Sequence, residues 1–271
     1  MKIINLMEDT EGASGCLYEH GLSFYAETKT HRYLFDFGAS DKTLVNACTL
    51  GIDLTTVDTA VLSHGHYDHS GGILAFSRIN PQVSIYMMVS AGEKHVHRIK
   101  DQMKDIGIDS QIRDLPQVHL LNGNCRLNNE LSLFSGVQAR RFPARGNKSL
   151  LREKDGTFVP DDFSHEMYAI LQADGRRILF SGCAHNGIVN ILEHCRRLYG
   201  WYPDMVIGGF HMILNHYRDE DIEMIEQVGK TLKQLPTVFY TGHCTGEQAV
   251  EILKQTLGEQ LQVIRCGSRI I

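Results

Sequence analysis

Residues 63–72 hold the densest set of potential metal ligands in the chain, in the order Ser-His-Gly-His-Tyr-Asp-His-Ser-Gly-Gly. The potential ligands are His64, His66, Asp68 and His69. Their imidazole nitrogens and carboxylate suit zinc or a similar transition metal. A polar loop without function rarely places four such side chains at this spacing before two glycines. Neither a calcium-binding EF-hand loop nor a His-Glu-x-x-His zinc helix fits the pattern, so the stretch predicts a different kind of metal site.

This stretch follows an expected strand and precedes an expected helix. Residues 57–62 are apolar and β-branched without a breaker, as in a short buried strand, and the glycine pair leads into an apolar segment typical of a helix start. In an extended chain, side chains two residues apart point the same way, so His64 and His66 can face one cation. Asp68 and His69 follow where the chain has begun to turn. The spacing therefore predicts two adjacent metal positions.

The composition is that of an ordinary globular enzyme. The chain has 271 residues, of which 42% are hydrophobic and 22% charged, and this length is ample for a sizeable core. A net charge of -5 argues against a broad nucleic-acid-binding face. No apolar run approaches the ~20 residues that cross a bilayer, and the first segment turns acidic too early for a secretory signal. Seven scattered cysteines without a Cys-x-x-Cys pair argue against a disulfide framework. We therefore expect a cytoplasmic protein that binds neither membrane nor nucleic acid.

The rest of the chain alternates short apolar strands with helices. Expected strands cover residues 2–6, 22–26, 32–36, 57–62, 83–89, 117–121, 131–134, 167–171, 177–181, 205–207, 237–240 and 262–266. Expected helices cover residues 41–50, 91–106, 187–199, 220–232 and 247–257. Residues 140–162 are the least regular part and gather six arginines and lysines. Such a loop is either simply solvated or, beside a metal site, able to hold a phosphate or carboxylate.

Four further histidines occupy loops that could face the same site. His185, His211 and His243 each follow an expected strand of the second half, and His20 lies within Glu19-His20-Gly21. A lone histidine is more often structural than functional. Strand ends on one edge of an α/β layer line one cleft, however, so we expect His185 and His243 to be metal ligands. We expect His20 and His211 to contact substrate.

Ser-His-x-His-x-Asp-His followed by Gly-Gly resembles the signature of the metallo-β-lactamase superfamily. Residues 19–23, 34–38, 182–190, 208–211 and 241–246 resemble one branch of it, described as metal-dependent hydrolases of β-lactamase superfamily II. Some archaeal relatives in that branch are described as dihydropterin-condensing synthases. The resemblance implies an α/β fold, an αββα four-layer sandwich with a one- or two-metal site at one edge. Because the expected ligands run from His64 to His243, we expect a single domain over residues 1–271.

The resemblance also implies roles for individual residues. Superfamily members use the residue at Asp36 to brace the metal-binding loop from behind. Many relatives carry an aspartate near the Cys183 position that bridges two metals, and this sequence lacks it. Cys183, Asp162 and His211 are the candidates to replace it. Superfamily members also place a metal-binding histidine just before the strand expected at 167–171, where the nearest residues are Asp162 and His165.

The ligand set predicts hydrolytic chemistry. The expected metal ligands are His64, His66, Asp68, His69, His185 and His243. A bound metal lowers the pKa of water from ~15.7 to about 7, so that water can attack an ester, lactone or phosphoester, and Asp68 is placed to orient it. The absence of Gly-x-Ser-x-Gly disfavours a serine hydrolase. We expect one or two divalent transition-metal ions, zinc first with iron or manganese as alternatives.

Two other classes of function stay open. The same metals could clamp the leaving group of a transferase that condenses a dihydropterin diphosphate with an aminobenzene ribofuranosyl phosphate. The chain could also be a non-hydrolytic metal-binding sensor or redox protein. In each enzymatic case the expected partner is a small-molecule substrate, phosphorylated or otherwise anionic.

Overall fold

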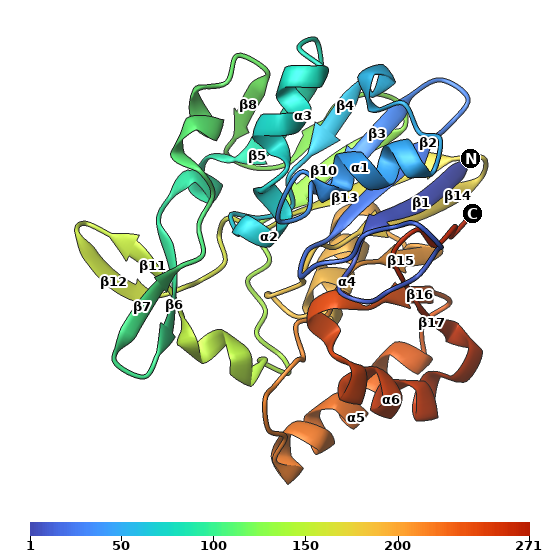
Figure 1. Ribbon diagram of the computed structural model, residues 1–271. Coiled ribbons are helices and arrows are strands. Elements are labelled where there is room, and N and C mark those ends of the chain that lie inside the picture. The colour runs from blue at the N-terminus through green and yellow to red at the C-terminus, as the bar shows by residue number, and fades with distance from the viewer.

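The computed structural model describes residues 1–271 as two β-sheets packed face to face, with helices on both outer faces (Figure 1). The first sheet has the order β1-β2-β3-β4-β5-β8, and the second has the order β17-β16-β15-β14-β13-β10-β9. The first sheet comprises β1 (Lys2–Met7), β2 (Ser23–Glu27), β3 (Arg32–Phe35), β4 (Thr59–Val61), β5 (Ser84–Met88) and β8 (Val118–Leu121). The second comprises β9 (Cys125–Arg126), β10 (Leu131–Ser135), β13 (Met167–Ala173), β14 (Arg176–Phe180), β15 (Met205–Ile207), β16 (Val238–Thr241) and β17 (Leu261–Val263).

Helices cover the two outer faces of this pair of sheets. They are α1 (Lys42–Thr49), α2 (Tyr67–Ser70), α3 (Ile73–Ile79), α4 (Ile188–Tyr199), α5 (Asp219–Lys233) and α6 (Glu247–Leu257). Buried residues of α1 and α3 pack into the same core as the first sheet, whereas buried residues of α4, α5 and α6 form a second core against the other sheet. The αββα sandwich expected from the sequence is confirmed. No helix combines the length and the apolarity needed to cross a membrane.

Strand β13 shows how the sequence builds these layers. Its residues alternate between two cores: Ala169 and Leu171 belong to the core between the sheets, and Tyr168 and Ile170 belong to the core under the helices. Successive side chains of a strand point to opposite faces, so a strand buried on both sides is apolar throughout. The unbroken apolar run at the start of β13 is therefore the signature of a central strand in a four-layer fold.

A third, smaller sheet projects from the sandwich, and it corrects the helix expected at residues 91–106. Its order is β12-β11-β6-β7, formed by β6 (His95–Ile99), β7 (Gln102–Asp105), β11 (Leu150–Lys154) and β12 (Thr157–Pro160) (Figure 1). The apolar residues Val96, Ile99, Met103 and Ile106 recur at helical spacing in the sequence. In the structure Ile99 and Met103 are exposed, and β6 pairs instead with β7 and β11. Tertiary strand pairing here overrides the local pattern.

The basic segment expected to be irregular is also more ordered than its sequence indicates, because it contributes β11 and β12. Two of its four arginines are engaged in ion pairs. Arg145 pairs with Asp221 at 2.8 Å, and Arg152 pairs with both Glu93 at 3.1 Å and Asp162 at 2.8 Å. These two guanidinium groups are therefore committed to the fold, and the basic side chains of the segment without an ion pair are Arg140, Arg141, Lys148 and Lys154.

The topology brings the expected site residues to one edge of the sandwich. Strands β3, β4 and β5 run parallel to each other, and so do β14, β15 and β16. Parallel neighbours present their carboxyl ends at the same edge. The loops after β4, β14, β15 and β16 carry, in that order, the 63–70 segment, His185, His211 and His243.

Candidate metal centre

Four buried side chains converge on one point at this edge. The His69 Nε2 atom lies 3.1 Å from Cys183 Sγ, 3.2 Å from His243 Nε2 and 3.6 Å from Asp68 Oδ2, and His243 Nε2 lies 3.3 Å from Asp68 Oδ2. Ligands at zinc distances of ~2.0–2.3 Å in a tetrahedron are about 3.3–3.8 Å apart. These separations are close to that range, so Asp68, His69, Cys183 and His243 form a candidate metal position, called site B below.

Carboxylates behind site B fix the orientation of its histidines. The His69 Nδ1 atom lies 2.7 Å from Asp36 Oδ2, and His243 Nδ1 lies 2.6 Å from Asp9 Oδ1. Asp36 also accepts hydrogen bonds from the backbone N–H and the hydroxyl of Ser63. Outer carboxylates of this kind leave the Nε2 atom of each histidine free for a metal. The bracing role expected for Asp36 matches this geometry.

Protonated histidine balances the negative charge of Asp68 in site B when no metal is bound. Burial would raise the pKa of Asp68, but His69, His243 and His20 together hold it well below its ordinary value. Burial would lower the pKa of His243, but Asp68 and Asp9 raise it well above its ordinary value. A proton on His243 therefore occupies the place where a metal cation would neutralise Asp68, and metal binding at site B must release protons.

A second set of three histidines lies beside site B. The ring centroids of His64, His66 and His185 are 4.6–5.0 Å apart, and the Nε2 atom of each ring is buried without a hydrogen-bond partner. Burial lowers the pKa of all three, so they are neutral imidazoles with lone pairs available. An unpartnered buried nitrogen is costly unless something binds it. Three together fit a second metal position, called site A.

Hydrogen bonds hold the site A histidines in place. The His64 Nδ1 atom lies 2.9 Å from Ser63 Oγ. Asn147 contacts His185 twice, through Oδ1 to the ring Nδ1 at 3.1 Å and through its amide N–H to the backbone carbonyl at 2.8 Å. The buried Glu166 carboxylate accepts the backbone N–H of His185 at 2.6 Å. The sequence pattern did not single out Asn147 or Glu166, because both lie far from the ligand motif in the chain.

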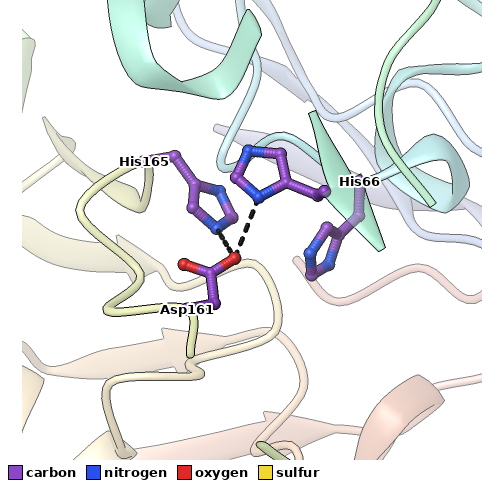
Figure 2. A group of neighbouring side chains, drawn as sticks. His66, Asp161 and His165 are labelled. Carbon is purple, nitrogen blue, oxygen red and sulfur yellow. Dashed lines mark hydrogen bonds and ion pairs between the residues drawn. The ribbon is translucent and has the colours of Figure 1, made fainter. Parts of the chain in front are cut away.

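His165 lies beside site A in a buried group with His66, His95 and Asp161, whose potential ligand atoms also lie within 4.8 Å of one another. Its Nδ1 atom accepts the backbone N–H of Gly65 at 2.9 Å, and its Nε2 atom lies 3.2 Å from Asp161 Oδ2. Figure 2 shows the Asp161 carboxylate pointing at the His165 ring, with no interaction drawn to His66. Asp161 also accepts from His95 Nδ1 at 2.9 Å. Because both His165 nitrogens are occupied, this network supports the loop between His64 and His66 and leaves metal binding to His185.

A cleft of about 470 Å³ opens above both sites. His20 and His211 line it, as expected for residues that contact substrate, together with Asp68, Cys183 and His185. The half-exposed His20 ring stacks on His243 at 4.8 Å, and its Nε2 atom lies 3.4 Å from Asp68 Oδ2. The His211 ring lies 4.0 Å from that of His185, and its Nδ1 atom is buried without a partner. Their contact with substrate stays a prediction.

Four of the nine non-glycine residues with a positive φ lie at this edge. Asp36, Ala184, His211 and His243 all have φ between 48° and 57°. For residues other than glycine this left-handed conformation costs about 1–3 kcal/mol each and persists where the surrounding structure over-determines it. Strained residues of this kind occur at functional sites, and these four directly precede, follow or form part of the candidate site.

Comparison with known proteins agrees with this geometry. The family model of the metallo-beta-lactamase superfamily matches residues 19–232. The chain belongs to the metallo-β-lactamase superfamily. It is 27% identical to the 7,8-dihydropterin-6-methyl-4-(beta-D-ribofuranosyl)-aminobenzene-5'-phosphate synthase of Methanocaldococcus jannaschii, over 100% of this chain and 96% of that protein. Among solved structures it is similar to Tm1679, a metal-dependent hydrolase of the β-lactamase superfamily, with 26% identity, a TM-score of 0.84 and coverage of 100% of this chain and 98% of the other.

A more distant structural relative shows the same fold. Zn(2+)-bound PqqB from Methylobacterium extorquens shares 14% identity with this chain at a TM-score of 0.60, and the match covers 100% of both chains. The metallo-β-lactamase superfamily binds divalent metals, and sites A and B supply histidine, aspartate and cysteine clusters for them. The donor set of this chain fits such ions.

In this metallo-β-lactamase fold, Cys183 occupies the space between sites A and B. Its Sγ atom groups both with Asp68, His69 and His243 and with His64 and His185. Asp162, by contrast, is half-exposed and paired with Arg152 at 2.8 Å, and His211 groups with Cys183 and Cys244 away from Asp68. Of the three candidates to replace the bridging aspartate, the geometry therefore favours Cys183.

We expect Cys183→Ala to change the spectrum of cobalt-substituted protein. Burial raises the pKa of the Cys183 thiol, so the charge of a bound metal is needed to form the thiolate that binds it. Wild-type protein loaded with Co(II) should show a sulfur-to-cobalt charge-transfer band in the near ultraviolet, and Cys183→Ala should lose it together with part of the bound metal. Cys195→Ser is the matched control, because Cys195 is a buried cysteine outside every candidate ligand group, and it should keep the band. A band that survives Cys183→Ala would remove Cys183 from the ligand set.

Proposed function

We propose that this chain is a metal-dependent hydrolase that acts on an ester, lactone or phosphoester group of a small molecule, with Asp68 as the catalytic residue that orients the attacking water. The observation that carries the proposal is that the four-residue ligand set of site B lies next to the three unpartnered histidine nitrogens of site A, and that both sets contribute residues to the wall of the 470 Å³ cleft. A cleft of this size suits a ligand of a few rings or sugar units. No side-chain nucleophile is needed, because bound metals supply a water of lowered pKa.

Each residue of the site has a task that its surroundings support. His64, His66 and His185 would hold a metal at site A, and Asp68, His69 and His243 would hold one at site B, with Cys183 between them. Asp68 keeps its negative charge and lies where it can accept a hydrogen bond from the attacking water. His20 lies beside Asp68 and is open to the cleft, so it is placed to move a proton to or from solvent.

A second candidate is favoured by one observation, the 27% identity to the archaeal dihydropterin-linked synthase across the full length of this chain. In a synthase the cleft would exclude water from the reacting carbon and present a second organic molecule as nucleophile. The two candidates share the metal sites and differ in what attacks. Cleavage that proceeds in buffer alone supports hydrolysis, whereas reaction only after addition of an aromatic amine supports synthesis.

The test combines metal analysis with a substrate panel. The purified protein should contain one to two transition-metal ions per chain and should lose activity on a panel of carboxylic esters, lactones and phosphodiesters when stripped by a chelator. Re-addition of zinc, iron or manganese should restore it and identify the working metal. Purified protein that holds no metal and takes none up would reject the proposal.

We also propose a reducing, cytoplasmic setting for this enzyme. All seven cysteines are free thiols, and Cys183 must stay reduced to serve as a ligand. The supporting argument is the buried position of Cys183 between the candidate metals, where oxidation would remove a ligand.

A further inference from the structure

We propose that His97 and Lys104 form a binding subsite for a phosphate group of the substrate, on the wall of the cleft above the metal sites. The proposal deepens the proposed function and rests on it, because it takes this cleft to be the substrate site. It assigns to the projecting β6–β7 hairpin the task of selecting phosphorylated small molecules.

The strand register places the two side chains on one face of the hairpin. His97 and Lys104 are direct partners in the antiparallel pairing of β6 with β7. Side chains directly opposite each other in such a pair point to the same face and lie within contact range. Both residues line the cleft. The hairpin thus presents a two-residue basic pair to the same space that sites A and B face.

Neither side chain has an acidic partner. No carboxylate lies within 4.0 Å of Lys104 or His97, whereas Arg145 and Arg152 are held by acidic residues. The Lys104 ammonium lies 5.5 Å from the centre of the Tyr67 ring, a contact that positions the amine without neutralising it. The only carboxylate that lines the cleft is Asp68, which site B uses. The positively charged side chain without an ion-pair partner in the cleft is therefore Lys104 on this hairpin.

The two residues complement each other as a phosphate binder. Burial, Lys104 and His211 lower the pKa of His97, so His97 is a neutral hydrogen-bond donor while Lys104 supplies the charge. Charge-assisted hydrogen bonds of this kind are the strong ones. Because the pair stands on the hairpin and the metals on the strand ends, the bound phosphate and the reacting bond are different parts of the substrate. The inferred substrate class is a small phosphorylated molecule cleaved at a bond away from its phosphate.

The experiment measures binding of phenylphosphonate, a non-hydrolysable phosphate probe, to metal-loaded protein by calorimetry. Lys104→Glu should weaken binding by about 10-fold or more, and His97→Ala should weaken it by a smaller factor. Lys94→Glu is the matched control: Lys94 lies just before β6 and contacts Phe158, and it does not line the cleft. It should bind the probe as wild type does. Metal content should be the same in all four proteins, because Lys104 is exposed and no variant touches a ligand.

The outcomes separate this proposal from the proposed function. Equal affinity in wild type and Lys104→Glu, or no measurable binding to wild type, overturns the phosphate subsite even if the protein hydrolyses the substrate panel. Loss of probe binding in Lys104→Glu, with wild-type binding kept in Lys94→Glu, supports the subsite even if the wild-type protein turns out to be a synthase. Binding that disappears only when the metals are removed would place the phosphate on the metals and would also overturn it.

Discussion

Asp68→Asn should remove about one metal ion per chain and lower turnover by about 10³-fold or more. The Asp68 Oδ2 atom lies 3.3 Å from His243 Nε2, 3.6 Å from His69 Nε2 and 3.4 Å from His20 Nε2, so it is shared by the metal position and the cleft. Asparagine keeps the size of the side chain but loses the negative charge. A bound metal stabilises the reaction by several kcal/mol, and each 1.36 kcal/mol is a factor of ten in rate.

The measurement pairs elemental analysis with turnover on the best substrate of the panel. Asp101→Asn, an equal change of charge on the exposed β6–β7 turn, is the matched control and should leave metal content and turnover unchanged. Full metal content and full turnover in Asp68→Asn would show that the chemistry lies elsewhere. Full metal content with reduced turnover would limit Asp68 to orienting the water.

Asp161→Asn should lower the free energy of unfolding by about 3–5 kcal/mol at neutral pH, the usual cost of removing one partner from a buried charged network. The Asp161 carboxylate is buried and accepts from both His165 and His95. Asparagine keeps only one acceptor oxygen, so its NH2 group must face either the two imidazoles or the Phe163 backbone N–H, and the negative charge is lost in both cases. Since His165 also receives the Gly65 backbone N–H, the damage should reach the metal loop and weaken metal binding.

The pKa of Asp161 predicts how the difference in the free energy of unfolding between wild type and Asp161→Asn changes with pH. Burial would raise the pKa of Asp161, but hydrogen bonds from His165 and His95 more than offset burial and hold the pKa well below its ordinary value. A carboxyl whose folded-state pKa is depressed stabilises the fold above its unfolded-state pKa, near 4, and this stabilisation is lost as pH falls below that value. The difference in the free energy of unfolding between wild type and Asp161→Asn should therefore become smaller below about pH 4.

Urea unfolding at several pH values, with chelator present so that metal release does not contribute, measures this difference. Asp162→Asn is the natural control, because Asp162 is the neighbouring carboxylate but is half-exposed and bonded to Arg152. Its effect should be within about 1 kcal/mol, the usual worth of an exposed ion pair. A difference that is constant from neutral to acid pH would mean that Asp161 acts through packing alone.

The sequence by itself indicated the four-layer fold, through motifs that resemble a known superfamily, and the candidate ligands of the metal loop. His64, His66, Asp68 and His69 lie within a span of six residues, so a strand followed by a tight turn is enough to point them at neighbouring positions. The apolar strands and amphipathic helices were readable for the same reason, because their periods are local properties of the chain. His185 and His243 could be placed near them because parallel strands end at one edge.

Only the tertiary structure decided what surrounds these ligands. Asp9 reaches His243 across 234 residues, Asn147 reaches His185 across 38, and Asp161 reaches His95 across 66. Such hydrogen bonds leave no periodic trace in the sequence, since each partner is set by how layers meet. The same holds for the β6–β7 hairpin, whose apolar spacing favours a helix until β11 pairs with it. The placement of Cys183 between the two metal positions likewise follows from the meeting of the two sheets, because the candidate ligands grouped with it come from both halves of the chain.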